Sequence, residues 1–261
     1  MPITDVPGKA KALYEARRDR VAIAPFTDED PTLGMADGYA VQSELTRLLL
    51  ADGDSIVGYK VGLTSKPMQK MIGVDSPDYG PVLASTVYRD GDAVSAGRFI
   101  QPKIEAEIVF VLGQTLTGPG VSVSDAYRAI AGAAASVEIV DSRFADWRIK
   151  LADTVSDLAS NGAVATASRL VPLTGFDVRL VGMTLTRNGA LVDTGAGAAA
   201  LGDPVAVVAW LANTLGAAGV ALEAGHLVMT GALHAAVPMR PGEVYRAEFD
   251  RLGAVTVRVV D

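Results

Sequence analysis

The segment spanning residues 102–112, PKIEAEIVFVL, constrains the fold more than any other part of the chain. Its composition is typical of a β-strand, and alternate side chains of a strand point to opposite faces, so Glu105 and Glu107 share one face. That face continues as two valines, whereas the opposite face is apolar throughout, with Ile104, Ala106, Ile108 and Phe110. The sequence therefore predicts a largely buried strand that carries two carboxylates at the border of the core.

Two interpretations of this carboxylate pair stay open, a solvent-facing polar edge and a metal site. Neighbouring carboxylates at the border of a core repel each other unless a cation or hydrogen-bond donors compensate them, and a hard divalent ion does so directly. A third carboxylate, Glu138, lies in the apolar run AAASVEIV, where an unpaired charge would be costly. An ion pair with Lys or Arg is the alternative for Glu138, and spacing alone does not place it beside Glu105 and Glu107.

Two residues of the first third of the chain raise similar questions. Lys60 interrupts the predicted strand 56–62, and buried lysines are rare, so it is either a snorkelling surface residue or a charge aimed at an acidic substrate. Asp78, in the sequence SPDYG, is by itself typical of a turn. The two histidines, His226 and His234, have no partner at metal-ligand spacing, and we expect both to be structural.

Composition excludes several classes of function. The chain contains no cysteine, which rules out disulfides, zinc–thiolate sites, iron–sulfur clusters and thiol nucleophiles. The formal net charge is −7, and no Lys/Arg cluster exceeds Arg17, Arg18 and Arg20, so we expect no nucleic-acid partner. No run of roughly 20 apolar residues suggests a membrane span, and the N-terminus lacks the apolar stretch of a secretory signal. We therefore expect no membrane partner and a cytoplasmic location.

The pattern of elements changes along the chain. Helices are predicted at 10–21 and around 41–49, the second ended by Asp52-Gly53, followed by the strand 56–62, a short helix at 65–71 capped by Ser65, and a loop to residue 80. Short β-rich runs then follow at 82–88, 104–112, 178–187, 190–194, 244–249 and 254–259, with Asn188-Gly189 as a hairpin turn and helices at 124–134 and 204–215. This mixture predicts an α+β fold, with a mainly helical N-terminal region at 1–74 and a β-rich catalytic domain at 75–261.

Several motifs, in order along nearly the whole chain, resemble those of the hydratase and decarboxylase branch of the fumarylacetoacetate hydrolase superfamily. Within that branch the similarity is to 2-keto-4-pentenoate (2-hydroxypenta-2,4-dienoate) hydratases. The motifs are KVGLTS at 60–65, PDYG at 77–80, the strand of Glu105 and Glu107, EIVDSR at 138–143, DTVSD at 153–157 and TGAL at 230–233. The resemblance implies the superfamily's mixed β-roll or sandwich with a small helical N-terminal part.

The resemblance also implies roles for individual residues. It carries a magnesium or manganese site onto Glu105, Glu107 and Glu138, and catalytic roles in proton transfer and substrate polarisation onto Asp78 and Lys60. Substrate binding is carried onto Leu63, Ser160 and Thr230. The chain departs from the family pattern at Leu158, where asparagine is usual, at Asp203, where histidine is usual, and at His234-Ala235-Ala236, where Gly-Pro-Met is typical. The last two departures leave the choice of substrate more open than metal binding.

The activity implied is a metal-dependent hydratase, which adds water to 2-hydroxypenta-2,4-dienoate or an alkyl homologue and gives 4-hydroxy-2-oxopentanoate in meta-cleavage catabolism of aromatic or steroid rings. A 4-oxalocrotonate decarboxylase is the nearest alternative, although Ala232 stands where decarboxylases usually have glycine. A hydrolase of the acylpyruvate type commonly uses a histidine base, and the N-terminal half has none. A non-catalytic metal-binding partner subunit is a further alternative, against which the intact Glu105, Glu107, Glu138 and Lys60 argue.

The expected partners follow from the same resemblance. We expect a small 2-hydroxydienoic or 2-oxo acid as substrate and a homo-oligomeric assembly. Association with a decarboxylase or an aldolase of the same pathway stays open.

Overall fold

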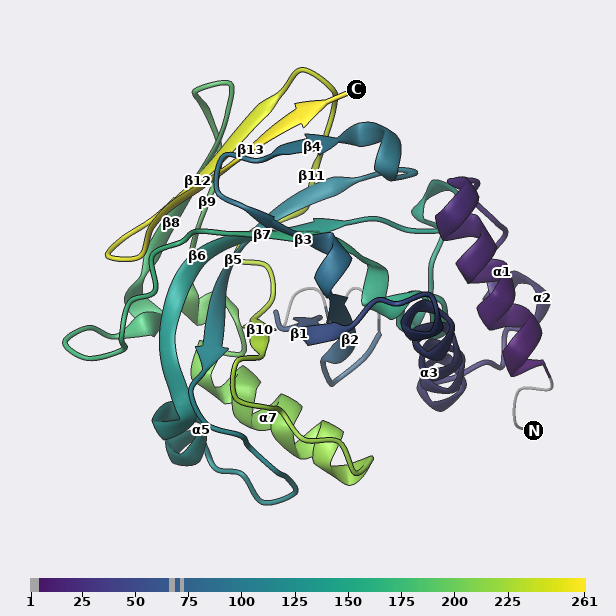
Figure 1. Cartoon of the computed structure of the whole chain (residues 1–261), viewed down its shortest axis with the longest axis horizontal. Helices are drawn as coiled ribbons and strands as arrows, with labels where there is room; N and C mark the ends of the chain where they lie inside the picture. Colours follow the sequence, from purple (N-terminus) through teal and green to yellow (C-terminus); the bar gives the residue numbers. More distant parts are fainter. Residues whose placement is uncertain (1–4, 66–68, 71–72) are drawn as a thin grey trace.

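Two β-sheets form the centre of the fold in the computed structural model, which describes residues 5–65, 69–70 and 73–261 (Figure 1). Within these residues the larger sheet has eight strands, in the order β2-β1-β10-β5-β6-β7-β3 with β11 paired to β5, and the smaller has five, in the order β4-β13-β12-β8-β9. The strands of the larger sheet are β1 (Ile56–Gly62), β2 (Asp78–Leu83), β3 (Val87–Arg89), β5 (Lys103–Leu112), β6 (Ile130–Val140), β7 (Asn161–Thr166), β10 (Leu227–Met229) and β11 (Val237–Pro238). Those of the smaller sheet are β4 (Ala93–Ser95), β8 (Gly182–Arg187), β9 (Ala190–Ala196), β12 (Val244–Phe249) and β13 (Gly253–Val260).

The main core lies where β5 and β6 face the smaller sheet. Ile108 and Phe110 of β5 are fully buried there in one apolar cluster with Leu185 of β8 and Val255 of β13. Val109 points to the other face of the larger sheet and packs with a small cluster that includes Met229. The predicted alternation of β5 is confirmed, and Glu105 and Glu107 consequently lie on the face turned away from the smaller sheet.

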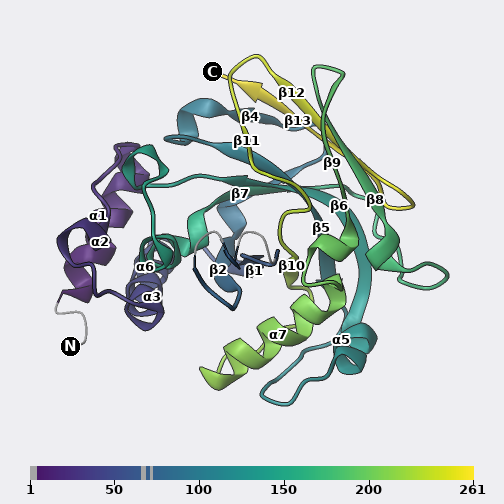
Figure 2. The same ribbon diagram turned by 180° about the vertical axis from the view of Figure 1, so that it is seen from behind.

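Helices cover the larger sheet at two places. One group is α1 (Val6–Asp19), α2 (Phe26–Glu29), α3 (Met35–Ala51) and α6 (Leu151–Ser156), which lie together at one side of the molecule (Figure 2). Leu13, Leu45, Phe144 and Leu158 form the buried cluster of this group. The other group is α5 (Val123–Ala129) and α7 (Pro204–Ala217), which contact each other. Short 3-10 helices connect the elements: η1 (Ala84–Thr86), η2 (Ala96–Arg98), η3 (Ala145–Trp147), η4 (Leu158–Ser160), η5 (Val178–Leu180) and η6 (Gly197–Ala199).

Most local signals in the sequence are borne out. Asp52 ends α3, and Asp203 caps α7 by accepting a hydrogen bond from the Val205 N–H. Asn188-Gly189 joins β8 to β9 with positive φ at both residues, as a tight hairpin turn requires. The α+β class is confirmed, since mixed sheets are combined with separate groups of helices.

Some predicted elements are wrong. The helix predicted at 124–134 ends at Ala129, because the alanine-rich run from Ile130 pairs along β5 as strand β6, and this long-range pairing outweighs the helix propensity of alanine. The loop predicted up to residue 80 ends earlier, since β2 begins at Asp78 and pairs with β1. The runs 82–88 and 178–187 are interrupted by η1 and η5. The sequence does not predict the short strands β4, β7, β10 and β11. The predicted helix 65–71 includes residues 66–68 and 71, which lie outside the described residues.

The boundary expected near residue 75 falls between β1 and β2, which pair with each other. The division into 1–74 and 75–261 stays a prediction.

One stretch, Gly197–Ala217, is long and apolar enough by length and composition to cross a membrane, contrary to the expectation that no apolar run is that long. Half of its most apolar window is buried (50%), and Val207, Val208 and Leu211 belong to the main core. We interpret this stretch as a core helix.

Candidate active site

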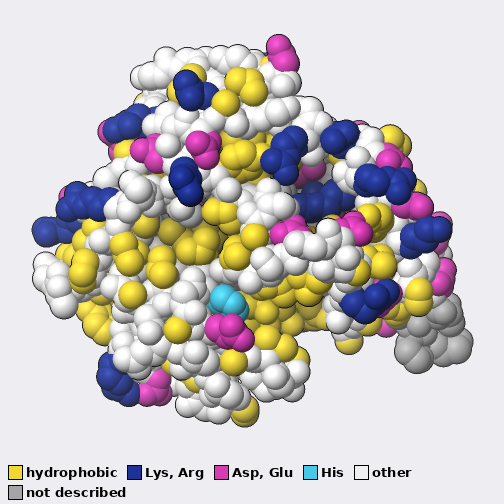
Figure 3. Space-filling model, in the orientation of Figure 1, with side chains coloured by type: hydrophobic (Ala, Val, Ile, Leu, Met, Phe, Trp, Pro, Cys, Tyr) yellow, Lys and Arg dark blue, Asp and Glu magenta, His cyan; other side chains and the backbone are white. Residues whose placement is uncertain are grey.

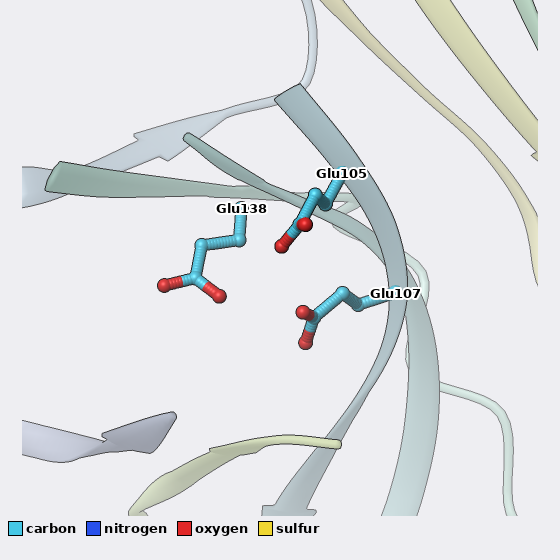
Figure 4. A group of neighbouring side chains, drawn as sticks. All are labelled: Glu105, Glu107 and Glu138. Atoms are coloured by element: carbon cyan, nitrogen blue, oxygen red, sulfur yellow. The ribbon is translucent and has the colours of Figure 1, made fainter. Parts of the chain in front are cut away.

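Three carboxylates converge on the face of the larger sheet that is turned away from the smaller sheet (Figure 4). Glu105 and Glu107 come from β5, and Glu138 of β6 lies directly opposite Glu105 in the antiparallel pairing. One oxygen from each side chain lies within 4.8 Å of the other two. Glu107 and Glu138 are buried (1% and 0% exposed), whereas Glu105 is partly exposed. The ambiguity between a solvated edge and a buried cluster is resolved in favour of the cluster.

Hydrogen-bond donors of the protein satisfy only some of the oxygens of these carboxylates. Glu107 Oε2 accepts a hydrogen bond from the Gly231 N–H (2.9 Å), and Glu138 Oε1 accepts one from Asn161 Nδ2 (2.8 Å). Glu138 Oε2 is buried and accepts no hydrogen bond from the part of the chain that the structure describes, and Lys60 Nζ lies 3.6 Å away. Burial and the charge of Glu138 raise the pKa of Glu105 to about 7 and that of Glu107 well above its usual value. An oxygen-only cluster with an unsatisfied buried oxygen fits a hard divalent cation such as Mg²⁺ or Mn²⁺.

The donor to Glu107 depends on a glycine. Gly231 has φ +98°, and a Cβ at this position would lie 2.1 Å from Thr64 Oγ1. Only glycine can therefore turn its backbone N–H toward Glu107 here.

Lys60 and Asp78 lie next to the carboxylate cluster, on the paired strands β1 and β2. Lys60 is buried, and its Nζ donates a hydrogen bond to the Ala159 carbonyl (2.9 Å). Burial alone would lower the pKa of Lys60, but the charges of Glu138 and Asp78 raise it above its usual value, so Lys60 is an ammonium ion at neutral pH. Asp78 is also buried, and its Oδ1 accepts no hydrogen bond from the described residues; burial raises the pKa of Asp78, although Lys60 opposes the shift. A Cβ at Gly62 would lie 2.2 Å from Asp78 Oδ1 and 3.0 Å from Lys60 Nζ, so glycine is needed where these side chains meet.

A strained turn holds the partners of Lys60 and Glu138. Leu158, Ala159 and Ser160 all have positive φ (54°, 52° and 59°), a conformation that costs energy for residues with a side chain. The turn directs the Ala159 carbonyl at Lys60 and is followed at once by Asn161, the donor to Glu138. Such strain persists where the surroundings enforce it, often at functional sites.

The predicted substrate-binding residues flank this site. Ser160 belongs to the strained turn, and its Oγ lies 3.0 Å from Thr154 Oγ1. Thr230 precedes Gly231 and donates to the Ile108 carbonyl, whereas Leu63 follows Gly62 with φ +56° and is half-buried. Their roles in binding substrate, like the ligand and catalytic roles of the other residues, stay predictions.

Other contacts were not foreseen from the sequence. Asn161, the Gly231 N–H and the Ala159 carbonyl all bond to predicted site residues. Only Gly231 stands in a motif that carried the family resemblance. His234 is structural as expected, since its Nε2 accepts from the Ala106 N–H, between the two glutamates of β5, and its Nδ1 lies 2.6 Å from the Ala235 carbonyl oxygen.

Known proteins are similar to this chain in sequence and in fold. Residues 59–260 match the family model described as fumarylacetoacetate (FAA) hydrolase C-terminal. The chain is 41% identical over 246 residues to a 2-keto-4-pentenoate hydratase of Paraburkholderia xenovorans (strain LB400), covering 94% of this chain and 91% of the relative. It is 38% identical over 255 residues to a 2-hydroxyhexa-2,4-dienoate hydratase of Comamonas testosteroni, covering 97% of each.

A solved structure is similar over almost the whole chain. The 4-oxalocrotonate decarboxylase from Pseudomonas putida G7, complexed with magnesium and adipate, superposes on this chain with a TM-score of 0.95 and is 37% identical to it in sequence. The alignment covers 99% of each chain. The family model and these relatives together show that the chain belongs to the fumarylacetoacetate hydrolase superfamily, in the branch of the hydratases and decarboxylases.

Proposed function

We propose that the protein is a metal-dependent hydro-lyase that adds water to 2-hydroxypenta-2,4-dienoate, or an alkyl homologue, and gives 4-hydroxy-2-oxopentanoate in meta-cleavage catabolism. The observation that carries the proposal is the convergence of Glu105, Glu107 and Glu138 beside the ammonium of Lys60 and the buried Oδ1 of Asp78. The names of the relatives at 41% and 38% identity support a hydratase.

Glu105, Glu107 and Glu138 hold the cation in this proposal. A bound Mg²⁺ or Mn²⁺ supplies positive charge that stabilises the negative charge developing on the 2-oxygen of the substrate. Lys60 keeps one N–H on the Ala159 carbonyl and has two further donors, which can bind the acidic substrate.

The reaction proceeds in two balanced steps. First, the 2-hydroxyl loses its proton and C5 gains one, which converts the dienol to 2-oxopent-3-enoate. Water then adds across the C3–C4 double bond, its oxygen to C4 and a proton to C3. Asp78 exchanges these protons, because burial holds its pKa above the usual carboxyl value and its Oδ1 accepts no hydrogen bond from the described residues. The buried surroundings of Asp78 and Lys60 keep both groups in fixed positions for this transfer.

A decarboxylase is the second candidate, favoured by the fold similarity to the 4-oxalocrotonate decarboxylase at 37% identity. The two activities differ in the bond that changes: the hydratase adds water to a monoacid, whereas the decarboxylase removes one carboxylate from a dicarboxylate. A hydratase must admit water at C4, whereas a decarboxylase must bind a dicarboxylate and release its second carboxylate as CO₂. The segment from Ala232 to Pro238 is apolar except for His234, whose ring nitrogens are both engaged with the backbone, which suits a monoacid better than a dicarboxylate.

Two substrates distinguish the candidates. The purified protein is incubated with enzymatically generated 2-hydroxypenta-2,4-dienoate and with 4-oxalocrotonate in ¹⁸O-labelled water, each with and without Mg²⁺. We expect Mg²⁺-dependent consumption of the monoacid with ¹⁸O at C4 of the product, and much slower turnover of the dicarboxylate. Rapid CO₂ release from 4-oxalocrotonate without hydration of the monoacid would assign the chain to the decarboxylases.

The setting of the enzyme is part of the same proposal. We infer a soluble, cytoplasmic homo-oligomer that associates with a decarboxylase or an aldolase of the same pathway. Size-exclusion chromatography with light scattering measures the oligomer, and a monomer at micromolar concentration would contradict it.

A further inference from the structure

An arginine-lined cavity of about 260 Å³ lies apart from the carboxylate cluster, between the C-terminal end of α1 and the segment that leads from β3 to β5. Five arginines line it: Arg17, Arg18, Arg20, Arg98 and Arg143. Figure 3 shows Lys and Arg side chains gathered on the face between α1 and β4. This concentration of positive charge stands out in a chain whose formal net charge is −7.

Only two of the five guanidinium groups are neutralised by carboxylates. Arg143 pairs with Asp157 (2.6 Å) and Asp141 (3.4 Å), and Arg18 pairs with the adjacent Asp19 (2.8 Å). Among the described residues, Arg17, Arg20 and Arg98 have no carboxylate oxygen within the 4.0 Å of an ion pair. Three guanidinium groups at one cavity therefore form no ion pair with a carboxylate of the described residues, although Asp141 also lines the cavity.

The hydrogen bonds of the unpaired arginines go to neutral groups. Arg17 donates to the backbone carbonyls of Asn161 (3.2 Å) and Gly162 (3.4 Å), and Arg98 donates to the Tyr88 hydroxyl and the Ser85 carbonyl. Burial and the positive charges of Arg143 and Arg98 lower the pKa of Arg17 to about 10, although Asp157 and Asp141 oppose the shift. An anion in the cavity would relieve this repulsion.

The helix dipole is an alternative reason for basic residues at this place. Cations near the C-terminus of a helix are stabilised by the dipole, which accounts for basic residues in the last turn of α1. It does not account for Arg98, which belongs to η2, or for Arg17 turning to the carbonyls at the start of β7. Residues from separate parts of the chain are thus brought together around one space.

We propose that this cavity binds a small doubly charged oxyanion, a phosphate or a dicarboxylate, through Arg17, Arg20 and Arg98. Guanidinium groups match carboxylate and phosphate oxygens with paired, charge-assisted hydrogen bonds. The volume is below the roughly 300–1,000 Å³ of sites for drug-sized ligands, which suits a small anion.

Calorimetric titration of the full-length, Mg²⁺-loaded protein tests the proposal. Sodium phosphate and sodium succinate are titrated separately, with ionic strength held constant by NaCl. We expect one saturable site for at least one of them, with a Kd at or below about 1 mM. The anion that binds identifies the ligand class, phosphate or dicarboxylate.

Two variants test whether the binding measured by calorimetry takes place in the cavity. Arg98→Gln and Arg20→Gln replace exposed arginines and are expected to weaken binding at least tenfold while circular dichroism shows an unchanged fold. Arg47→Gln is the matched control, because Arg47 pairs with Glu44 on α3 outside the cavity and its loss changes the net charge equally. Arg17 is left intact because it holds the backbone of Asn161, the donor to Glu138.

Three results would overturn the proposal. The first is the absence of saturable binding of both anions up to about 10 mM, far above the expected Kd. The second is an equal Kd in the wild type, Arg98→Gln and Arg20→Gln. The third is complete competition by 2-oxopentanoate, which would place the anion at the proposed active site.

Discussion

Replacing Glu107 by glutamine should separate two effects of the carboxylate cluster: the electrostatic repulsion that destabilises the metal-free protein, and the binding of the metal ion. The carboxylate oxygens lie within 4.8 Å of one another, and like charges at that limit repel by about 3.5 kcal/mol at an effective dielectric constant of about 20. Burial and this repulsion hold the pKa of Glu107 well above its usual value in the metal-free protein. A glutamine keeps an acceptor for the Gly231 N–H and removes the charge. The metal-free variant should therefore be at least as stable as the wild type, by up to about 3 kcal/mol in the free energy of unfolding.

Bound metal should make the wild type more stable than the Glu107→Gln variant. At a free Mg²⁺ concentration of 100 times its Kd, the wild type gains about 2.7 kcal/mol. Loss of a residue that merely orients a ligand costs roughly 10–100-fold in affinity, so loss of a charged ligand should cost at least about 100-fold. At the same Mg²⁺ concentration the variant then gains only about 0.4 kcal/mol.

Urea unfolding in EDTA and in Mg²⁺ measures both effects, and calorimetry measures the Kd. Glu248→Gln is the matched control, because it removes an exposed carboxylate from β12. A metal-free Glu107→Gln variant that is less stable than the wild type by more than about 2 kcal/mol would show that the carboxylate is structurally required. An unchanged gain from Mg²⁺ would show that Glu107 is not a ligand.

Three further predictions concern the same site. Asn161→Ala removes the donor to Glu138 Oε1 and should weaken Mg²⁺ binding about 10–100-fold in calorimetry; an unchanged Kd would contradict this orienting role. Because the pKa of Glu105 is raised to about 7 without metal, protons compete with the ion below that pH, and Mg²⁺ affinity should fall as the pH is lowered from 8 to 6. Titrations in buffers of different ionisation enthalpy should detect proton release at pH 6, and a pH-independent Kd would refute the competition. Exhaustive EDTA treatment followed by gel filtration should abolish turnover of 2-hydroxypenta-2,4-dienoate, and added Mg²⁺ or Mn²⁺ should restore it; full activity after chelation would remove the metal from the mechanism.

The sequence alone predicts the parts of the site that depend on local periodicity. Alternation along β5 places Glu105 and Glu107 on one face because side chains of a strand repeat every two residues. The position of Glu138 depends on the register between β5 and β6, which no local signal specifies, and only the family resemblance brought it to the pair. The same long-range pairing made the helix prediction wrong at 130–134. The contact from Asn161 to Glu138 is equally non-local, since it requires the turn of Leu158 to Ser160 to present the start of β7 to the site.

The turn of residues 158–160 also packs against the N-terminal helices and so connects them to the proposed active site. Leu158 has an unfavourable positive φ, yet its side chain is buried in the apolar cluster that contains Leu13 and Leu45. Gln42 of α3 adds hydrogen bonds to the carbonyls of Tyr79 in β2 and Val155 in α6. Packing by α1 and α3 thus offsets the strain of a turn whose next carbonyl, that of Ala159, holds Lys60. Burial in this cluster accounts for leucine at position 158. We therefore expect the helices to help hold the ammonium of Lys60 beside Glu138, although they contribute none of the predicted metal ligands.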